Sequence, residues 1–232
     1  MNVVRRRANP LEEFERDGYA VVPGLITERE AAATSRALER VRLRVVGTRN
    51  LLRRPWCRAL VQRIRTRLTG AKALPASFVA VQCTLFDKSL QRNWLVALHQ
   101  DLSIPVKARV DHPALGAWSK KEGETFVQPP REILETLMAV RVHIDACGLE
   151  NGPLRVVPGS HRRGRLSDAA ARELRSVLGE EPCLVKSGDA ILMRPLILHA
   201  SSKAVASSRR RVLHFLFGPA SLLYGLEWKH AI

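Results

Sequence analysis

The chain has 232 residues, of which 46% are hydrophobic, and its 38 Lys+Arg against 22 Asp+Glu give a net charge of +16 with His neutral. A hydrophobic share near the globular average of about 45–50% excludes wholesale disorder. No apolar run approaches the roughly 20 residues of a membrane span, and the N-terminal residues lack the apolar core of a secretory signal. We expect a single domain over residues 1–232, located in the cytoplasm, without a membrane partner.

The basic excess bears on which partners the protein could bind, and the four cysteines bear on whether it contains a zinc site. Excess positive charge suits nucleic acid, a membrane surface or an acidic ligand, and a genome that favours Arg would produce it as well. Only 5% of residues are aromatic, which leaves few platforms for stacking bases, so we expect at most weak, non-specific binding of nucleic acid. The cysteines, scattered without a CxxC pair, do not indicate a zinc ribbon.

Helical patterns dominate the first third of the chain. Helices are predicted over residues 11–17, from Glu28 onward, and over residues 55–68. Thr27 is the expected N-cap of the second helix, because Glu30 stands three residues further on and completes a capping box. A short strand is predicted over residues 20–22.

From residue 77 onward the pattern changes to short β-branched and apolar runs, which are typical of strands. Strands are predicted over residues 77–86, 93–99, 138–144, 152–157, 183–185, 190–193, 197–201 and 211–217. The polar segment 111–130 is predicted to be a long loop, and loops of that length usually act as lids or binding loops. Asp168 is the expected cap of a helix that reaches about Leu178.

Helices followed by about eight short strands favour an α+β layout over an alternating α/β one. Eight short strands in one domain fit a jelly roll. We therefore expect a mostly β core over residues 76–218, supported by the helices of residues 1–75 and followed by a tail over residues 219–232.

The residues available for chemistry are histidines and carboxylates. The chain has no GxSxG, P-loop, HExxH or strand-linked GxGxxG motif. It has two H-x-D triplets, His99-Gln100-Asp101 and His143-Ile144-Asp145. Residues i and i+2 of a strand face the same side, so either triplet plus a third His would form the 2-His-1-carboxylate triad of non-haem iron sites. From the residues alone, a hydrogen-bonded pair in a half-buried strand explains each triplet at least as well.

Three longer segments add to this pattern. They are FERDGYAVVPG at 14–24, ALHQD at 97–101 with LHAS at 198–201, and ENGPLRVVPGSH at 150–161. Together they resemble the phytanoyl-CoA dioxygenase family, over residues from about 11 to 217. The resemblance implies a double-stranded β-helix, a form of jelly roll. It also implies Fe(II), 2-oxoglutarate and O2, which such proteins use mostly to hydroxylate an unactivated carbon with release of succinate and CO2.

Carried onto this chain, the resemblance assigns the metal to His99, Asp101 and His199. Relatives that halogenate lack the carboxylate, so Asp101 favours hydroxylation or a related oxidation. The family's metal triplet lies well before its ENG segment, which favours His99 over His143. His143 is then expected to face the barrel interior near the substrate.

The resemblance also indicates residues for 2-oxoglutarate, whose buried distal carboxylate needs a cation such as the bidentate Arg fork. The family's arginine follows the last metal His by eleven positions, which gives Arg210. Within the run Arg209-Arg210-Arg211, a slip of one residue leaves Arg211 as the alternative. Ser201 matches a serine that holds the same carboxylate, and Gln82 resembles the co-substrate-contacting Gln of ectoine hydroxylase, a relative.

Further residues are assigned by strand face or by their place near the expected mouth of the barrel. His214 shares a face with Val212 and Leu216 and is interpreted as a core histidine. Trp94 and Trp118 fit substrate contact and ordinary loop packing equally well. Arg141 faces the same way as His143 and is placed to meet an anionic substrate.

The resulting prediction is a mononuclear non-haem Fe(II), 2-oxoglutarate-dependent dioxygenase. We expect it to hydroxylate a small-molecule or carrier-linked substrate. The basic charge of the chain is compatible with an anionic substrate. Two alternatives stay open. One is a catalytically silent jelly roll that binds a small molecule or partner, and the other is an oxygenase or binding protein that acts on nucleic acid through its basic surface.

Overall fold

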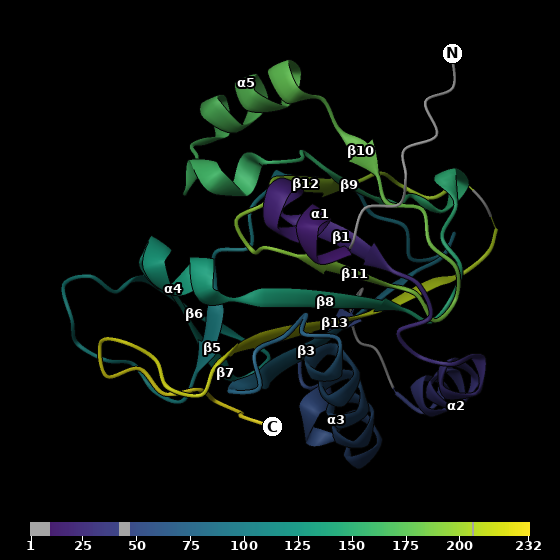
Figure 1. Cartoon of the computed structure of the whole chain (residues 1–232), viewed down its shortest axis with the longest axis horizontal. Coiled ribbons are helices and arrows are strands. Elements are labelled where there is room, and N and C mark those ends of the chain that lie inside the picture. Colours follow the sequence, from purple (N-terminus) through teal and green to yellow (C-terminus); the bar gives the residue numbers. More distant parts are fainter. Residues whose placement is uncertain (1–9, 42–46, 206) are drawn as a thin grey trace.

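The computed structural model describes residues 10–41, 47–205 and 207–232. Within these ranges the strands occupy the middle of the molecule and most helices lie outside them (Figure 1). The helices are α1 (Pro10–Asp17), α2 (Glu28–Glu39), α3 (Pro55–Gly70), α4 (Arg131–Thr136) and α5 (Asp168–Leu178). None of the helices in the described ranges has the length and apolar character needed to cross a membrane.

Most strands belong to two antiparallel sheets. The larger sheet has the order β1 (Tyr19–Val22), β11 (Ala190–Met193), β8 (Met138–His143), β13 (Arg210–Pro219), β3 (Phe78–Lys88) and β2 (Gly47–Thr48). The smaller sheet has the order β10 (Glu181–Pro182), β9 (Leu154–Val156), β12 (His199–Ser201) and β4 (Val96–His99). The last strand, β13, lies between β8 and β3, so strands distant in sequence are neighbours in space.

Two hydrophobic clusters separate the faces of the larger sheet. Its outer face packs on the N-terminal helices through residues that include Leu38, Ile64, Leu85, Val140 and Phe215. Its inner face and the smaller sheet share the second cluster, which includes Val81, Ala139, Ile191, Leu216, Leu154 and Val156. The two inner faces therefore meet in a double-sheet core, and the mostly β, jelly-roll fold expected from the sequence is confirmed.

The N-terminal helices support the larger sheet as predicted. The Thr27 hydroxyl accepts the Glu30 N–H at 3.2 Å while the Glu30 carboxylate accepts the Thr27 N–H at 2.8 Å, which confirms the capping box. Arg67 of α3 donates to the same carboxylate at 2.7 Å, and this bond with the Thr27 contacts lowers the pKa of Glu30 to about 2. The cap of α2 is thus also its link to α3.

The loop predicted over residues 111–130 is wrong, because most of it is a hairpin. Strands β6 (Gly116–Lys121) and β7 (Glu124–Gln128) pair with each other, and β7 also pairs with β5 (Ile104–Val106). The turn residues Glu122 and Gly123 both have positive φ, 51° and 81°, as two-residue hairpin turns require. Strand β6 is largely exposed, so it lacks the apolar alternation by which a strand is recognised.

Smaller differences concern element ends. The strand expected over residues 183–185 lies earlier, at Glu181–Pro182, and Val185 makes only a bridge to Cys147. The cap of α5 is Ser167, whose hydroxyl accepts the Ala170 N–H at 3.3 Å. Asp168 is instead the first helical residue, since Ser and Asp are adjacent and both suit the cap position.

Candidate active site

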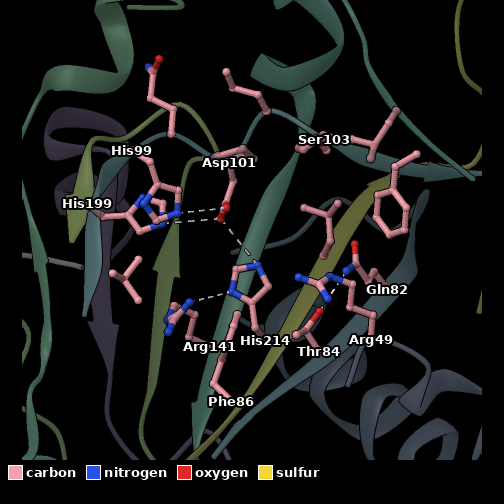
Figure 2. A pocket seen from close by; sticks show the side chains of 18 of the residues that line it. Arg49, Gln82, Thr84, Phe86, His99, Asp101, Ser103, Arg141, His199 and His214 are labelled. Carbon is pink, nitrogen blue, oxygen red and sulfur yellow. Dashed lines mark hydrogen bonds and ion pairs between the residues drawn. The ribbon is translucent and has the colours of Figure 1, made fainter. Parts of the chain in front are cut away.

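Three side chains capable of holding a metal meet where β4 and β12 pair. His99 ends β4 and His199 begins β12, and the two residues are direct partners in the sheet. Asp101 follows β4, held by its N–H donating to Pro195 O at 2.9 Å. Its carboxylate oxygens lie 3.7 Å from Nε2 of each histidine. Figure 2 shows both imidazoles turned toward this carboxylate.

Backbone hydrogen bonds orient both histidines. Nδ1 of His99 lies 2.8 Å from Ala97 O, and Nδ1 of His199 lies 2.9 Å from Ile197 O. A carbonyl oxygen only accepts, so each Nδ1 carries the proton and each Nε2 presents its lone pair. This arrangement fixes the tautomer that a metal-binding histidine uses.

The charge states of the group also suit a cation. Burial lowers the pKa of His199 to about 4, so its imidazole is neutral at pH 7. Partial burial would raise the pKa of Asp101, but the neighbouring His199, His214 and His99 outweigh it and hold the pKa at about 2. Across the described ranges, these three residues form the group of His, Cys, Asp and Glu side chains close enough to share one ion, with ligand atoms within 4.8 Å.

A cavity of about 330 Å³ lies between the two sheets and contains this group. Its walls include all six site residues expected from the sequence: Gln82, His99, Asp101, His199, Ser201 and Arg210. The size falls within the range of about 300–1,000 Å³ typical of small-molecule sites. The structure therefore brings together residues that are up to 128 positions apart, as between Gln82 and Arg210.

Arg210 extends into the cavity and has no carboxylate within ion-pair distance among the described residues. Its guanidinium donates to Gly152 O, lies 3.5 Å from Ser201 Oγ, and leaves Nε without a partner. Gly152 has a φ of 61°, and a Cβ there would lie 2.3 Å from Ser202 O. Only glycine fits this close approach, so the ENG turn is what brings the Gly152 carbonyl to Arg210.

Arg211 lies on the opposite face of β13 and is not a cavity residue. Its guanidinium makes an ion pair with Asp145 at 2.7 Å and donates to Ser35 at 2.8 Å. The neighbouring Arg209 pairs with Asp87 at 2.6 Å. Of the three consecutive arginines, Arg210 is the one that lines the cavity. Asp145 is engaged by Arg211, so the rival triplet His143-Ile144-Asp145 does not form a metal group.

Lys88 is a buried residue beside Arg210 to which the sequence analysis assigned no role. Its ammonium is buried and donates to Ser201 Oγ at 3.0 Å and Ser202 O at 2.6 Å, beside the Trp94 ring. Burial and the positive charge of Arg210 lower the pKa of Lys88 to about 7. Lys88 pairs with Arg210 across β3 and β13, a relation that only the strand register reveals.

His214 is buried and hydrogen-bonded, as expected of a core histidine, but it has a second environment that the sequence did not indicate. Its ring lines the cavity, with Nε2 at 3.9 Å from the Asp101 carboxylate and Nδ1 at 3.0 Å from Arg141 Nη1 (Figure 2). The face it shares with Leu216 is apolar, but this is the inner face of the barrel, which forms both core and cavity. Arg141 lines the cavity too, whereas His143 is buried without lining it.

The two tryptophans whose role the sequence did not decide lie in different parts of the structure. Trp94 lines the cavity beside Lys88. Trp118 lies away from it and packs under Arg109, 5.7 Å from the ring centre. Gln82 donates to Thr84 Oγ1 at 2.9 Å within the cavity wall, which leaves its carbonyl oxygen free of a bond within the described residues.

The residues present fit both a divalent metal and a dicarboxylic acid. Two neutral Nε2 atoms and one carboxylate form the donor set expected of a facial triad. Arg141 and Arg210 line the cavity as buried cations without a carboxylate within 4 Å among the described residues, and the buried Lys88 is the strand partner of Arg210. Because a buried charge must be paired, the cavity suits anionic groups near each of these two arginines.

Comparison with known proteins gives a consistent result. A family model described as Phytanoyl-CoA dioxygenase (PhyH) matches residues 14–212. Dioxygenase cnsJ of Penicillium expansum is 33% identical over 89 residues, which are 38% of this chain and 26% of that protein. The alignment thus spans about a quarter of that relative.

Solved structures with the same fold include two proteins of nogalamycin biosynthesis. The non-heme alpha ketoglutarate dependent epimerase SnoN superposes with a TM-score of 0.68 at 19% identity, over 91% of this chain and 80% of that one. The carbocyclase SnoK, described as dependent on the same compound, superposes with a TM-score of 0.65 at 17% identity, over 93% and 85%. At these identities the likeness shows the shared fold.

Proposed function

The chain belongs to the phytanoyl-CoA dioxygenase family, and on that premise we propose that it is a mononuclear non-haem iron, 2-oxoglutarate-dependent oxygenase that hydroxylates a small or carrier-linked substrate. One observation carries the proposal. A single cavity holds a His-Asp-His group and a buried arginine without a carboxylate partner among the described residues. The first is suited to iron and the second to the far carboxylate of a dicarboxylic acid.

His99, Asp101 and His199 hold the iron in this proposal. Their ligand atoms lie within 4.8 Å of one another, and a triad of this type would leave positions on the ion for other ligands. The backbone bonds to Nδ1 of both histidines fix the rings before metal binds. When bound, iron and 2-oxoglutarate supply the oxidising power, as O2 is consumed and 2-oxoglutarate is converted to succinate and CO2.

Arg210, Ser201 and Lys88 hold the distal carboxylate of 2-oxoglutarate. Arg210 offers the unpartnered Nε, and Lys88 and Ser201 already share a hydrogen bond of 3.0 Å. All three are buried, so water is excluded and each charge-assisted bond is stronger than it would be in solvent. Gln82, also in the wall, contacts the same co-substrate from β3.

The protein's own contribution is positioning and the exclusion of water. His199 and Arg210 lie on facing sheets and are both buried, so a molecule that bridges them lies in a fixed orientation. Asp101 and His99 are partly exposed at the mouth, which leaves that side for the substrate to enter. Shielding of this kind keeps a reactive site from attacking solvent or the protein itself.

Hydroxylation is the outcome we propose among those known for this chemistry. SnoN and SnoK are described as an epimerase and a carbocyclase, so the shared fold accommodates products other than alcohols. Asp101 occupies the position that halogenating relatives leave free for a halide. Product mass separates the outcomes: an alcohol gains about 16 mass units, ring closure with loss of two hydrogens loses about 2, and an epimer is unchanged.

The proposal is tested by succinate formation from 2-oxoglutarate under air, with and without added Fe(II). We expect iron-dependent succinate from the wild type and none above background from His199→Ala. His112→Ala is the matched control, because His112 lies outside the cavity wall. It should keep the wild-type rate.

Either of two results would contradict the proposal. One is a folded wild type that neither binds Fe(II) under anaerobic conditions nor forms succinate, which would favour the binding-module alternative. The other is equal activity in His199→Ala and the wild type, which would place the metal elsewhere.

A further inference from the structure

A second buried arginine, Arg141, lies near the metal group and has no role in the proposed binding of iron or 2-oxoglutarate. It stands in the middle of β8 with 7% of its surface exposed, and it lines the cavity. Nη1 lies 3.0 Å from Nδ1 of His214, and Nε has no partner. No carboxylate of the described residues lies within 4 Å of its guanidinium, in contrast to Arg209 and Arg211.

Arg141 is a permanent positive charge. Burial and the nearby Arg210 lower its pKa to about 10, so the guanidinium stays protonated at neutral pH. A buried cation that is not paired costs several kcal/mol. The ring of Phe86, 5.2 Å from the guanidinium carbon, offsets a part of that cost through a cation–π contact. The remaining donor capacity faces the cavity.

The position of Arg141 separates it from the co-substrate end. In the sheet, Arg141 is paired with His214 of β13, whereas Arg210 is paired with Lys88 of β3. The two pairs are therefore four residues apart along β13, a backbone span of about 13 Å, and the nearest partners of Arg210 are Gly152 and Ser201. His214 lies 3.9 Å from Asp101, which places the Arg141–His214 pair at the metal end (Figure 2).

Charge balance leaves this arginine without a partner even when the site is filled as proposed. A divalent metal, the dianion of 2-oxoglutarate and Asp101 sum to a charge of −1, and Arg210 brings this to zero. Arg141 then remains as an uncompensated positive charge, before Lys88 is counted. The mouth adds Lys121, which also lines the cavity. A third anionic group would balance the site.

The other residues that line the cavity indicate the chemical character of the rest of the ligand. Phe86 packs against Arg141, and further apolar side chains line the cavity: Leu102, Phe126, Leu134, Leu137 and Leu216. A molecule that fits them carries an apolar body and one acidic group.

We propose that Arg141, oriented by His214, binds a carboxylate of the substrate, so that the substrate is a small organic acid with an apolar body. This rests on the proposed function and names the substrate class of the same cavity. Arg141 is a specificity-determining residue in this account, and His214 is a positioning residue, because its ring holds the guanidinium toward the cavity.

Two probe pairs test the charge preference: benzoate with benzamide, and hexanoate with hexanamide. Each pair matches in size and differs in charge. Binding is measured by calorimetry to the whole chain saturated with Fe(II) and 2-oxoglutarate under anaerobic conditions. Saturation keeps the probes from entering the co-substrate end. We expect at least one acid to bind ten times more tightly than its amide, as a charge-assisted bond of about 1.5–3 kcal/mol implies.

The variants are Arg141→Gln, which removes the charge, and Arg141→Lys, which keeps it. Arg141→Gln should bind that acid about tenfold more weakly and its amide as the wild type does. Arg141→Lys should retain part of the preference. Thr84→Ser is the matched control, because Thr84 also lines the cavity but is uncharged. Circular dichroism verifies that each variant is folded.

A second arm distinguishes the substrate from 2-oxoglutarate as the source of the carboxylate. The affinity for 2-oxoglutarate is measured for Arg141→Gln and for Arg210→Met. The proposal expects a change below threefold in the first and a loss of about 100-fold in the second. A comparable loss in both would assign Arg141 to 2-oxoglutarate and overturn the proposal.

Absence of any preference for acid over amide in both probe pairs would overturn it as well, as would an unchanged preference in Arg141→Gln. Failure of the proposed function has a different signature. In that case the wild type itself would bind neither Fe(II) nor 2-oxoglutarate, before any probe is added.

Discussion

Consecutive arginines at the start of β13 differ in their partners according to the side of the sheet on which they lie. On the outer side, Arg211 and Arg209, the residue just before β13, each make an ion pair with an aspartate, Asp145 and Asp87. On the inner face, Arg210 is buried with neutral oxygens as its partners. Arginine therefore forms structural ion pairs on one side of the sheet and lacks a carboxylate partner on the other side, among the described residues.

The difference shows how to separate structural charges from charges that await a ligand. A folded chain supplies carboxylates to the cations it needs for its own stability, because an unpaired buried charge is costly. Where it does not, as at Arg210 and Arg141, the counter-ion is expected from outside. Four changes test this distinction, from the largest expected effect to the smallest.

Replacing Arg210, the arginine on the inner face, should weaken co-substrate binding most strongly. We expect Arg210→Met to weaken the affinity for 2-oxoglutarate by about 100-fold, since truncating one partner of a buried charge pair costs about 2–5 kcal/mol. Its stability should change little or rise, because no carboxylate of the described residues is left behind. Anaerobic calorimetry with Fe(II) present measures the affinity, and a change below threefold would contradict the assignment.

Replacing Arg211, the buried arginine on the outer face, should lower stability and leave co-substrate binding unchanged. Arg211→Met leaves the Asp145 carboxylate partly buried and unpaired, so the free energy of unfolding should fall by about 2 kcal/mol. The affinity of the folded protein for 2-oxoglutarate should be unchanged. Urea unfolding measures the first quantity, and adding Asp145→Asn should restore part of the loss. An undiminished stability would show that the outer pair is not structural.

Lys88 should make stability depend on pH. Its pKa is lowered to about 7 in the folded chain, against about 10.4 for a free lysine. Between these values the unfolded chain binds more protons, so stability rises with pH, by at most about 1.4 kcal/mol per pH unit. Lys88→Met should be more stable than the wild type at pH 7, by a margin that shrinks toward pH 10. Urea unfolding of both proteins at pH 7, 8, 9 and 10 tests this; parallel curves would contradict it.

Removing the exposed outer arginine should matter least. The Arg209 side chain is 43% exposed, and exposed ion pairs contribute at most about 1 kcal/mol. Asp87 also keeps Arg92 as a partner at 3.0 Å. We expect Arg209→Gln to lower the free energy of unfolding by less than about 1 kcal/mol and to leave 2-oxoglutarate binding unchanged. A larger loss of stability, or a change in 2-oxoglutarate binding, would contradict the distinction between the arginines of the two faces.

Local patterns in the sequence predicted much of this arrangement. The capping box of α2 and the strands that carry His99 and His199 follow from residues near one another in the chain, and the spacing from His199 to Arg210 was implied by the family resemblance. The choice between Arg210 and Arg211 did not, because one residue of register reverses the face of a strand. That choice depends on Asp145, which lies 66 residues away.

The residues that the sequence analysis missed share one cause, since each depends on a contact distant in the chain. Lys88 lies beyond the strand predicted over residues 77–86, and only its bond to Ser201, 113 residues on, links it to the cavity wall. His214 alternates with apolar residues, which fits a core face, and nothing local says that this core contains a cavity. The hairpin over β6 and β7 is the exception, because its Glu-Gly turn was visible in the sequence.

The most direct test of the central claim is an anaerobic titration with Fe(II) and 2-oxoglutarate, followed by the visible charge-transfer band of their complex. The account predicts the band in the wild type and in Arg211→Met, its absence in His199→Ala, and its appearance in Arg210→Met only at about 100-fold higher 2-oxoglutarate. Absence of the band in folded wild type, or equal titrations of Arg210→Met and Arg211→Met, would contradict it.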